Sequence, residues 1–155
     1  MQPATVARLS KHDLIVAVKE ASGSVEQMAE IILRCGGRID LLSGDDAITF
    51  PILAIGGTGV VSVTGNIVPK DVRAMISAYE KGDLDKAREL HYSLLPLNQS
   101  MFIETNPMPV KEAMNMLGMG VGNVRLPLVR MLPANLEKLA AALTAYGLKV
   151  KNPPA

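Results

Sequence analysis

Three short apolar runs, separated by helical segments, set the fold class of this chain. They are "LIVAV" at residues 14–18, "IDLLS" at 39–43 and "GVVSVT" at 59–64. Runs of this length that are rich in β-branched residues or leucine are typical of buried strands. Strands that alternate with helices predict βαβ units, whose strands lie parallel in one sheet. The sequence therefore predicts an α/β fold that begins with three parallel strands.

Apolar residues at helical spacing mark the other segments. The pattern of three- and four-residue steps covers residues 25–32, 72–79, 84–94 and 136–143, and a shorter helix is expected over 110–117. Ser24, with Gln27 three residues later, predicts a capping box, and Gly36 predicts a left-handed helix end. Pro69 and Pro133 suit first helical turns. From about residue 69 onward the sequence predicts only helices.

Three strands leave the predicted sheet incomplete. Three parallel strands that are buried on both faces cannot close a barrel, and their edges stay open to pairing with another chain. The pattern therefore predicts that part of the sheet is missing.

The composition excludes several classes of protein. The chain has 155 residues, enough for one domain, and its net charge of +1 argues against nucleic acid or an anionic membrane as a partner. It contains no apolar run of about 18 residues that could span a membrane, and its first residues lack the apolar core of a signal peptide. A single cysteine, Cys35, excludes an internal disulfide. We expect a cytoplasmic protein.

Functional groups in parallel α/β folds gather where the strands end, and the first apolar run ends in Lys19. A lysine amine that is kept dry gives up its proton more easily and can attack a carbonyl to form a Schiff base. The alternative is a charge that marks the exit of the chain to solvent. Spacing alone favours the solvated charge.

The second run is followed by "SGDD" at 43–46. Paired carboxylates can bind a metal or share a proton, but no histidine or third carboxylate lies nearby, so a helix cap is favoured. Gly44 lets a ligand approach the backbone closely. The glycine-rich stretch at 55–66 lacks the spacing of a phosphate loop and predicts a turn. The sequence predicts neither a metal site nor a cofactor.

Several motifs in register carry a resemblance to a known family. They are "VAVKEASGS" at 16–24, "LLSGDDA" at 41–47, "IGGTGVVSVTGN" at 55–66, "NPMPVKEAMNMLG" at 106–118 and "VRLPL" at 124–128. Essentially the whole chain resembles the C-terminal half of the dihydrodipicolinate synthase family, in the pyruvate-dependent class I aldolase superfamily. The resemblance implies strands six to eight of a (β/α)8 TIM barrel. Residues 1–68 would form this partial barrel with three β/α units, and residues 69–155 the last barrel helix and a C-terminal helical subdomain.

The resemblance also implies an activity. The family forms a Schiff base between a strand-six lysine and pyruvate, and the enamine adds to aspartate 4-semialdehyde to give 4-hydroxy-tetrahydrodipicolinate in lysine biosynthesis. Carried over by motif, the Schiff-base lysine is Lys19. Gly44 and Val61 match positions that line the pyruvate site, and Val61 stands where the family often has isoleucine. No cofactor is implied, and we expect a homo-oligomer.

This chain departs from the family pattern by lacking the first five strands. With them go a Gly-Thr-Thr segment that holds the carboxylate of pyruvate, the proton-relaying tyrosines and the arginine that receives the semialdehyde. Tyr79, Tyr92 and Tyr146 match none of those tyrosines, and Met1 falls a few residues after the strand-five motif. We therefore expect a truncated chain. Two alternatives stay open: an inactive or self-associating half-barrel, and a sugar-acid aldolase of the same superfamily.

Overall fold

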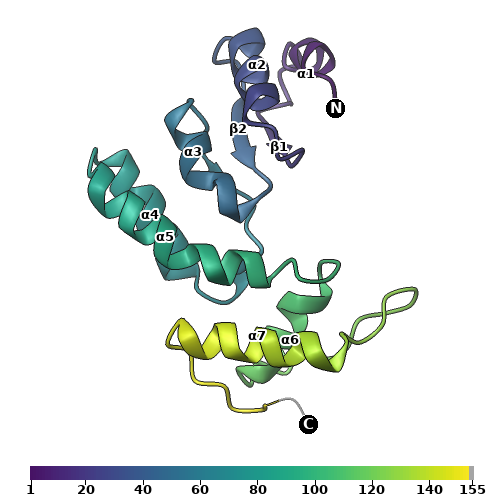
Figure 1. Cartoon of the computed structure of the whole chain (residues 1–155). Helices are drawn as coiled ribbons and strands as arrows, with labels where there is room; N and C mark the ends of the chain where they lie inside the picture. Colours follow the sequence, from purple (N-terminus) through teal and green to yellow (C-terminus); the bar gives the residue numbers. More distant parts are fainter. Residues whose placement is uncertain (154–155) are drawn as a thin grey trace.

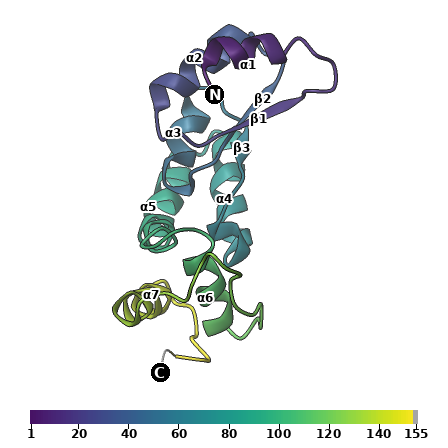
Figure 2. The same cartoon turned by 90° about the vertical axis from the view of Figure 1, so that its right-hand side faces the viewer.

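The computed structural model describes residues 1–153 and contains a small sheet followed by helices (Figure 1). Its elements, in chain order, are α1 (Pro3–Leu9), β1 (Ala17–Glu20), α2 (Val25–Cys35), β2 (Asp40–Ser43), the 3-10 turn η1 (Asp46–Ile48), α3 (Thr49–Ala54), β3 (Gly59–Val60), the 3-10 turn η2 (Thr64–Asn66), α4 (Pro69–Glu80), α5 (Leu84–Ser100), α6 (Met108–Met116) and α7 (Pro133–Ala145). The sheet with α1 to α3 lies at one end of the molecule, and α6 and α7 lie at the other (Figures 1 and 2). No helix within residues 1–153 is long and apolar enough to cross a membrane.

The three strands are parallel and follow the order β1-β2-β3, which confirms the predicted α/β arrangement. Lys19 pairs with Leu42, and Ser43 pairs with Val60. β3 is only two residues long, so most of the third apolar run is not a strand. The reason is that the backbone N–H groups of Val63 and Thr64 donate to a carboxylate instead of to a neighbouring strand.

The prediction for the first strand is wrong in its bounds and in its burial. β1 begins at Ala17, and the side chains of Leu14 and Val16 are 84% and 70% exposed. The sheet is also not buried on both faces. In Figure 2, α2 and α3 lie on one side of the strands. Val18 packs against a cluster of buried residues that includes Met28 and Ile31 of α2 and Ile52 of α3. Side chains alternate between the two faces of a strand, and Ala17 and Lys19, on the other face, are exposed.

The helices begin and end largely where the sequence predicts. Ser24 Oγ accepts a hydrogen bond from Gln27 N at 3.1 Å, and Gly36 ends α2 with φ of 58°. The other half of the predicted capping box is wrong, because the Gln27 amide donates to Glu20. Pro69 and Pro133 stand in the first turns of α4 and α7 as predicted. Helix α1, which the sequence pattern does not predict, packs against α2.

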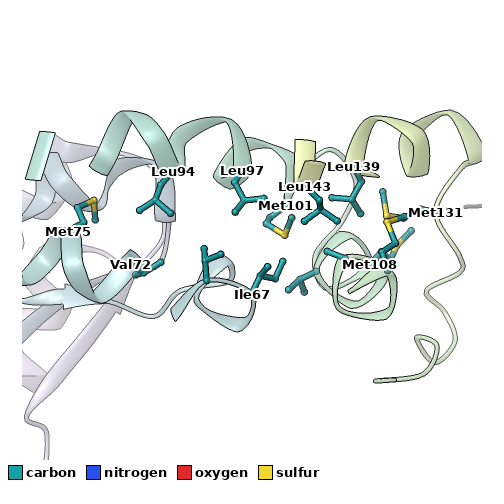
Figure 3. Packing of buried hydrophobic residues seen from close by; sticks show 14 residues of the cluster. Ile67, Val72, Met75, Leu94, Leu97, Met101, Met108, Met131, Leu139 and Leu143 are labelled. Atoms are coloured by element: carbon teal, nitrogen blue, oxygen red, sulfur yellow. The ribbon is translucent and has the colours of Figure 1, made fainter. Parts of the chain in front are cut away.

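Apolar side chains gather in two clusters. The larger one joins α4, α5, α6 and α7, and Figure 3 shows Leu94 and Leu97 of α5 in the same row of side chains as Leu139 and Leu143 of α7. The smaller one lies between α1, α2, the sheet and α3, and it includes the buried thiol of Cys35, which has the packing role that its place near a helix end suggests. The domain boundary at residue 68 stays a prediction.

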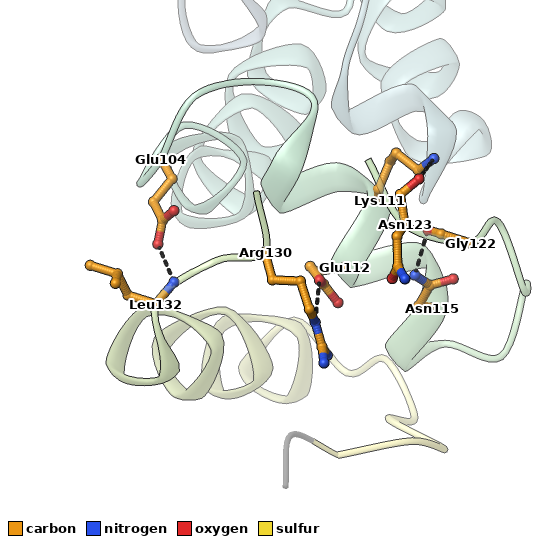
Figure 4. Close-up of polar contacts among 8 residues, drawn as sticks. All are labelled: Glu104, Lys111, Glu112, Asn115, Gly122, Asn123, Arg130 and Leu132. Carbon is orange, nitrogen blue, oxygen red and sulfur yellow. Dashed lines mark hydrogen bonds and ion pairs between the residues drawn. The ribbon is translucent and has the colours of Figure 1, made fainter. Parts of the chain in front are cut away.

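Polar contacts fix the long segment between α6 and α7 onto its neighbours (Figure 4). They are the bonds from Lys111 Nζ to Asn123 O (2.8 Å), from Asn115 Nδ2 to Gly122 O (3.0 Å) and from Leu132 N to Glu104 Oε1 (2.9 Å), with an ion pair between Arg130 Nε and Glu112 Oε1 (3.7 Å). The C-terminal helices therefore form a packed unit next to the sheet region.

Candidate active site

The three residues predicted for the site lie at one end of the sheet. Lys19 is near the carboxyl end of β1, and its backbone neighbour across the ladder is Leu42. Gly44 follows Leu42 by two residues, and Val61 follows Gly59, the partner of Leu42, by two residues. Gly44 and Val61 lie just past the ends of β2 and β3. Extending the two-residue repeat of the strands puts them on the side of Lys19, and the short distance from Gly44 to Lys19 Cε agrees with this. This is the face that α2 and α3 leave uncovered.

Gly44 is in close contact with the lysine. A Cβ atom at this position would lie 2.9 Å from Lys19 Cε, 2.5 Å from Ala21 Cβ and 3.1 Å from Glu20 O. The backbone N–H of Gly44 donates to Glu20 O at 2.7 Å, which draws the ends of β1 and β2 together. The stem of Lys19 therefore lies across Gly44, and a larger residue would displace it.

The amine of Lys19 is open to solvent. Its side chain is exposed, and within residues 1–153 it forms neither a hydrogen bond nor an ion pair. Residues 1–153 therefore do not form the dry pocket in which a lysine amine becomes reactive, and the role of Lys19 stays a prediction. On this face the two residues of the edge strand β1, Ala17 and Lys19, are both exposed. Val61 lies there too, with 43% of its surface exposed.

The two aspartates of "SGDD" have different roles. Asp45 Oδ1 accepts from Ala47 N at 2.9 Å, which is the predicted cap. Asp46 is buried and accepts hydrogen bonds from Val63 N at 2.8 Å, from Thr64 N at 3.2 Å and from the hydroxyl of Ser62. It therefore fixes the chain directly after Val61. The sequence does not reveal this role, since no local pattern connects residues that are 16 to 18 positions apart.

Two titratable groups of the helical region have shifted pKa values. His91 is buried in α5 beside the ring of Phe50, and this burial lowers its pKa. Tyr146 follows α7 and donates to Asp71 at 2.8 Å; burial and the hydrogen bond to Asp71 raise its pKa to about 12. In the part of the chain that the structure describes, no three His, Cys, Asp or Glu side chains gather to hold a metal ion.

A parallel sheet with helices on one face and candidate residues at the carboxyl ends of its strands fits a section of a β/α barrel. The sequence profile of the Dihydrodipicolinate synthetase family matches residues 1–146, and the chain belongs to this family. Strands β1 to β3 are thus strands six to eight of a (β/α)8 TIM barrel, and the helical C-terminal subdomain follows them. This confirms the fold class that the motifs predict.

Comparison with individual proteins shows how much of such a barrel is present. The chain is 53% identical over 146 residues to 4-hydroxy-tetrahydrodipicolinate synthase of Geobacter sp. strain M21, which covers 94% of this chain and 50% of that protein. The crystal structure of dihydrodipicolinate synthase from Aquifex aeolicus is similar with a TM-score of 0.93 and 43% identity, covering 97% of this chain and 52% of that one. The enzyme of Acinetobacter baumannii, described as chloride-inhibited and solved in complex with pyruvate, matches with a TM-score of 0.91 and 31% identity, over 96% of this chain and 51% of that one. The chain spans about half the length of the curated relatives that it matches.

Proposed function

We propose that this chain supplies the Schiff-base half of a 4-hydroxy-tetrahydrodipicolinate synthase active site, with pyruvate and L-aspartate 4-semialdehyde as substrates. One observation carries the proposal: the stem of Lys19 lies across Gly44 at the carboxyl end of a parallel strand, on the uncovered face of the sheet. In a barrel, this end holds the functional groups. The names of the curated relatives and the pyruvate complex of the Acinetobacter baumannii enzyme support the choice of reaction.

In this proposal the amine of Lys19 attacks the keto carbon of pyruvate. The keto oxygen leaves as water, and a carbon–nitrogen double bond forms to Nζ. Loss of a proton from the methyl group then gives an enamine, whose carbon attacks the aldehyde of the semialdehyde. The absence of a side chain at Gly44 leaves room beside the nitrogen, and Val61 supplies an apolar wall on the same face.

The remaining groups of the reaction belong to the half of the barrel that this chain lacks relative to its relatives. General acids and bases and electrostatic groups supply a large part of such a rate. We therefore expect this chain by itself to form the imine slowly and not to complete the condensation.

The experiment is borohydride trapping in the presence of pyruvate, followed by intact-mass measurement and peptide mapping. We expect one reduced pyruvyl adduct, located on Lys19 and absent from Lys19→Ala. The matched control is Lys11→Ala, which removes another exposed lysine from the segment before β1 and should leave the adduct unchanged. If folded wild-type protein gives no adduct, the chain does not form the imine, and the proposal fails for it.

We also propose that the chain self-associates, because a specific observation favours it. Leu14 and Val16 are exposed beside β1, which is an edge strand, and the adjoining face of the sheet is uncovered. Such an edge is a template for pairing with another strand. Light scattering coupled to size-exclusion chromatography tests this: Val16→Lys should shift the protein toward the monomer. A monomeric wild type at the highest accessible concentration would contradict it.

A further inference from the structure

Glu20, the residue after Lys19, has its side chain on the opposite face of β1. Glu20 is the last residue of β1, and its side chain faces α2 with only 6% of its surface exposed. Its carboxylate accepts hydrogen bonds from Ser22 N at 3.1 and 3.2 Å, from Ser22 Oγ at 2.9 Å and from Gln27 Nε2 at 2.9 Å. Hydrogen bonds to an ionised acceptor are stronger than those between neutral groups. The carboxylate therefore ties the end of β1 to the first turn of α2.

The backbone of the same residue ties β1 to β2. Glu20 O accepts from Gly44 N at 2.7 Å, directly beside the contact between Gly44 and the stem of Lys19. Glu20 is thus held on its side chain by α2 and on its carbonyl by the loop after β2. Because successive side chains point to opposite faces, fixing Glu20 under α2 fixes Lys19 on the uncovered face. If residue 20 turned away from α2, the lysine would leave its place over Gly44.

We propose that Glu20 is a positioning residue for the Schiff-base lysine: its buried carboxylate anchors the end of β1 to α2 so that the amine of Lys19 stays over Gly44. Glu20 touches no substrate and acts through the strand. The inference rests on the proposed function of Lys19. A misplacement of about 1 Å at a reacting group can cost about a hundredfold in rate, so a loosened strand end has a measurable effect on imine formation.

The main alternative is that Glu20 only stabilises the start of α2. Negative side chains at the start of a helix are stabilising in general, and Glu26, in the first turn of α2, is one such group. Glu26 is exposed and forms no side-chain hydrogen bond to β1 among residues 1–153. Glu26→Ala is therefore the matched control, because it removes the same charge from the same helix end without touching the strand.

The test measures the rate of borohydride-trapped adduct formation at Lys19 at saturating pyruvate. We expect Glu20→Ala to lower this rate by about tenfold or more, with a smaller change in the pyruvate concentration that gives half the maximal rate. Glu20→Gln, which keeps the shape and one acceptor oxygen, should recover most of the loss, and Glu26→Ala should match wild type. Unchanged trapping in Glu20→Ala would overturn the proposal, and so would an equal loss in Glu26→Ala.

Backbone hydrogen exchange of the ligand-free protein provides a second measurement that does not depend on pyruvate. We expect Glu20→Ala to speed exchange at the amides of Ser22 and Gly44 while the amides of α5 keep their rates. Exchange that is unchanged at Ser22 and Gly44, or raised throughout the molecule, would overturn the positioning role. If wild type itself gives no adduct, the proposed function fails, and this measurement still decides whether Glu20 holds the strand end.

Discussion

The helical region from α4 to α7 and the sheet region from α1 to β3 bury apolar side chains to very different degrees. Fourteen buried residues form the cluster of the helical region, and Phe50, Val60 and Val63 from the preceding segments also pack against it. Six buried residues form the cluster of the sheet region, which covers only one face of the strands. Since burial of apolar surface is the main stabilising contribution, the helical region is largely complete within this chain, whereas the sheet region depends on what covers its other face.

The same difference in burial explains where the candidate site residues lie. The helical region is enclosed, and it contributes none of the residues predicted for the site. Lys19, Gly44 and Val61 lie on the face of the sheet that residues 1–153 leave open. An active site in a barrel needs a face that substrates can reach and that other strands can complete. The region whose sheet has an open face therefore carries the candidate site.

The largest effect is expected from a cavity in the helical core. Leu97 is 1% exposed and lies in the middle of the larger cluster, so Leu97→Ala should lower the free energy of unfolding by about 2–5 kcal/mol. Met28, with 0% exposed surface, is the matched position in the smaller cluster. Met28→Ala should open the sheet region without lowering the stability of α4 to α7, as seen by urea unfolding and residue-level hydrogen exchange. If both variants melt the whole chain in one step, the two regions form one cooperative unit and the comparison fails.

Gly44→Ala tests the close contact on the open face. The added Cβ would meet Ala21 Cβ at 2.5 Å and Lys19 Cε at 2.9 Å. We expect a loss of about 1–3 kcal/mol in unfolding free energy, together with slower trapping of pyruvate at Lys19. Adding Ala21→Gly removes the shorter of the two contacts and should recover part of the stability. Full activity and stability in Gly44→Ala would show that the lysine does not lie across this residue.

Asp46→Ala removes the acceptor that fixes the chain after Val61. Three donors lose their partner, and two of them are the backbone N–H groups of Val63 and Thr64. We expect a loss of about 1–3 kcal/mol and faster exchange of these two amides. Asp45→Ala is the control, since it removes only a hydrogen bond to Ala47 N and should cost about 1 kcal/mol. Equal effects of the two variants would mean that Asp46 is no more than a second cap.

The smallest effect is expected in the helical region, on the pH dependence of the free energy of unfolding. The pKa of Tyr146 is raised from 10.0 to about 12, first by burial and then by its hydrogen bond to Asp71. Between these two pH values the unfolded chain loses the phenol proton before the folded chain does, so the free energy of unfolding falls as the pH rises. Tyr146→Phe should cost about 1 kcal/mol at neutral pH and should flatten the decline between pH 10 and about 12.

Tyr92→Phe is the control for this measurement, because the Tyr92 side chain is 63% exposed. It removes a phenol hydroxyl that forms no hydrogen bond among residues 1–153 and should leave the free energy of unfolding at neutral pH as in wild type. A decline of the same slope in Tyr146→Phe and in wild type would show that Tyr146 does not titrate in this window.

The sequence by itself determined α2, the four helices α4 to α7 and the order of the elements, and it singled out Lys19 as the candidate lysine. Helix signals are local: a cap such as Ser24, a first-turn proline such as Pro69 and a period of three to four residues all lie within one segment. The three short apolar runs likewise predicted the number and order of the strands, because each run is a local signal. The motif around Lys19 gave its role as a prediction because several motifs stand in the family's order.

Only the tertiary structure decided which face of the sheet is open, where β1 begins and what holds the strand ends. Leu14 and Val16 have the composition of a buried strand but lie exposed, because burial depends on neighbours that a local pattern does not contain. Glu20 and Asp46 are charged residues that sequence patterns place in solvent or at a cap, and both are buried acceptors. The donors to Glu20 come from Ser22 and from Gln27 in α2, and those to Asp46 lie 16 to 18 residues away. A buried carboxylate is stable only where donors from other segments converge on it, and the folded chain alone brings those segments together.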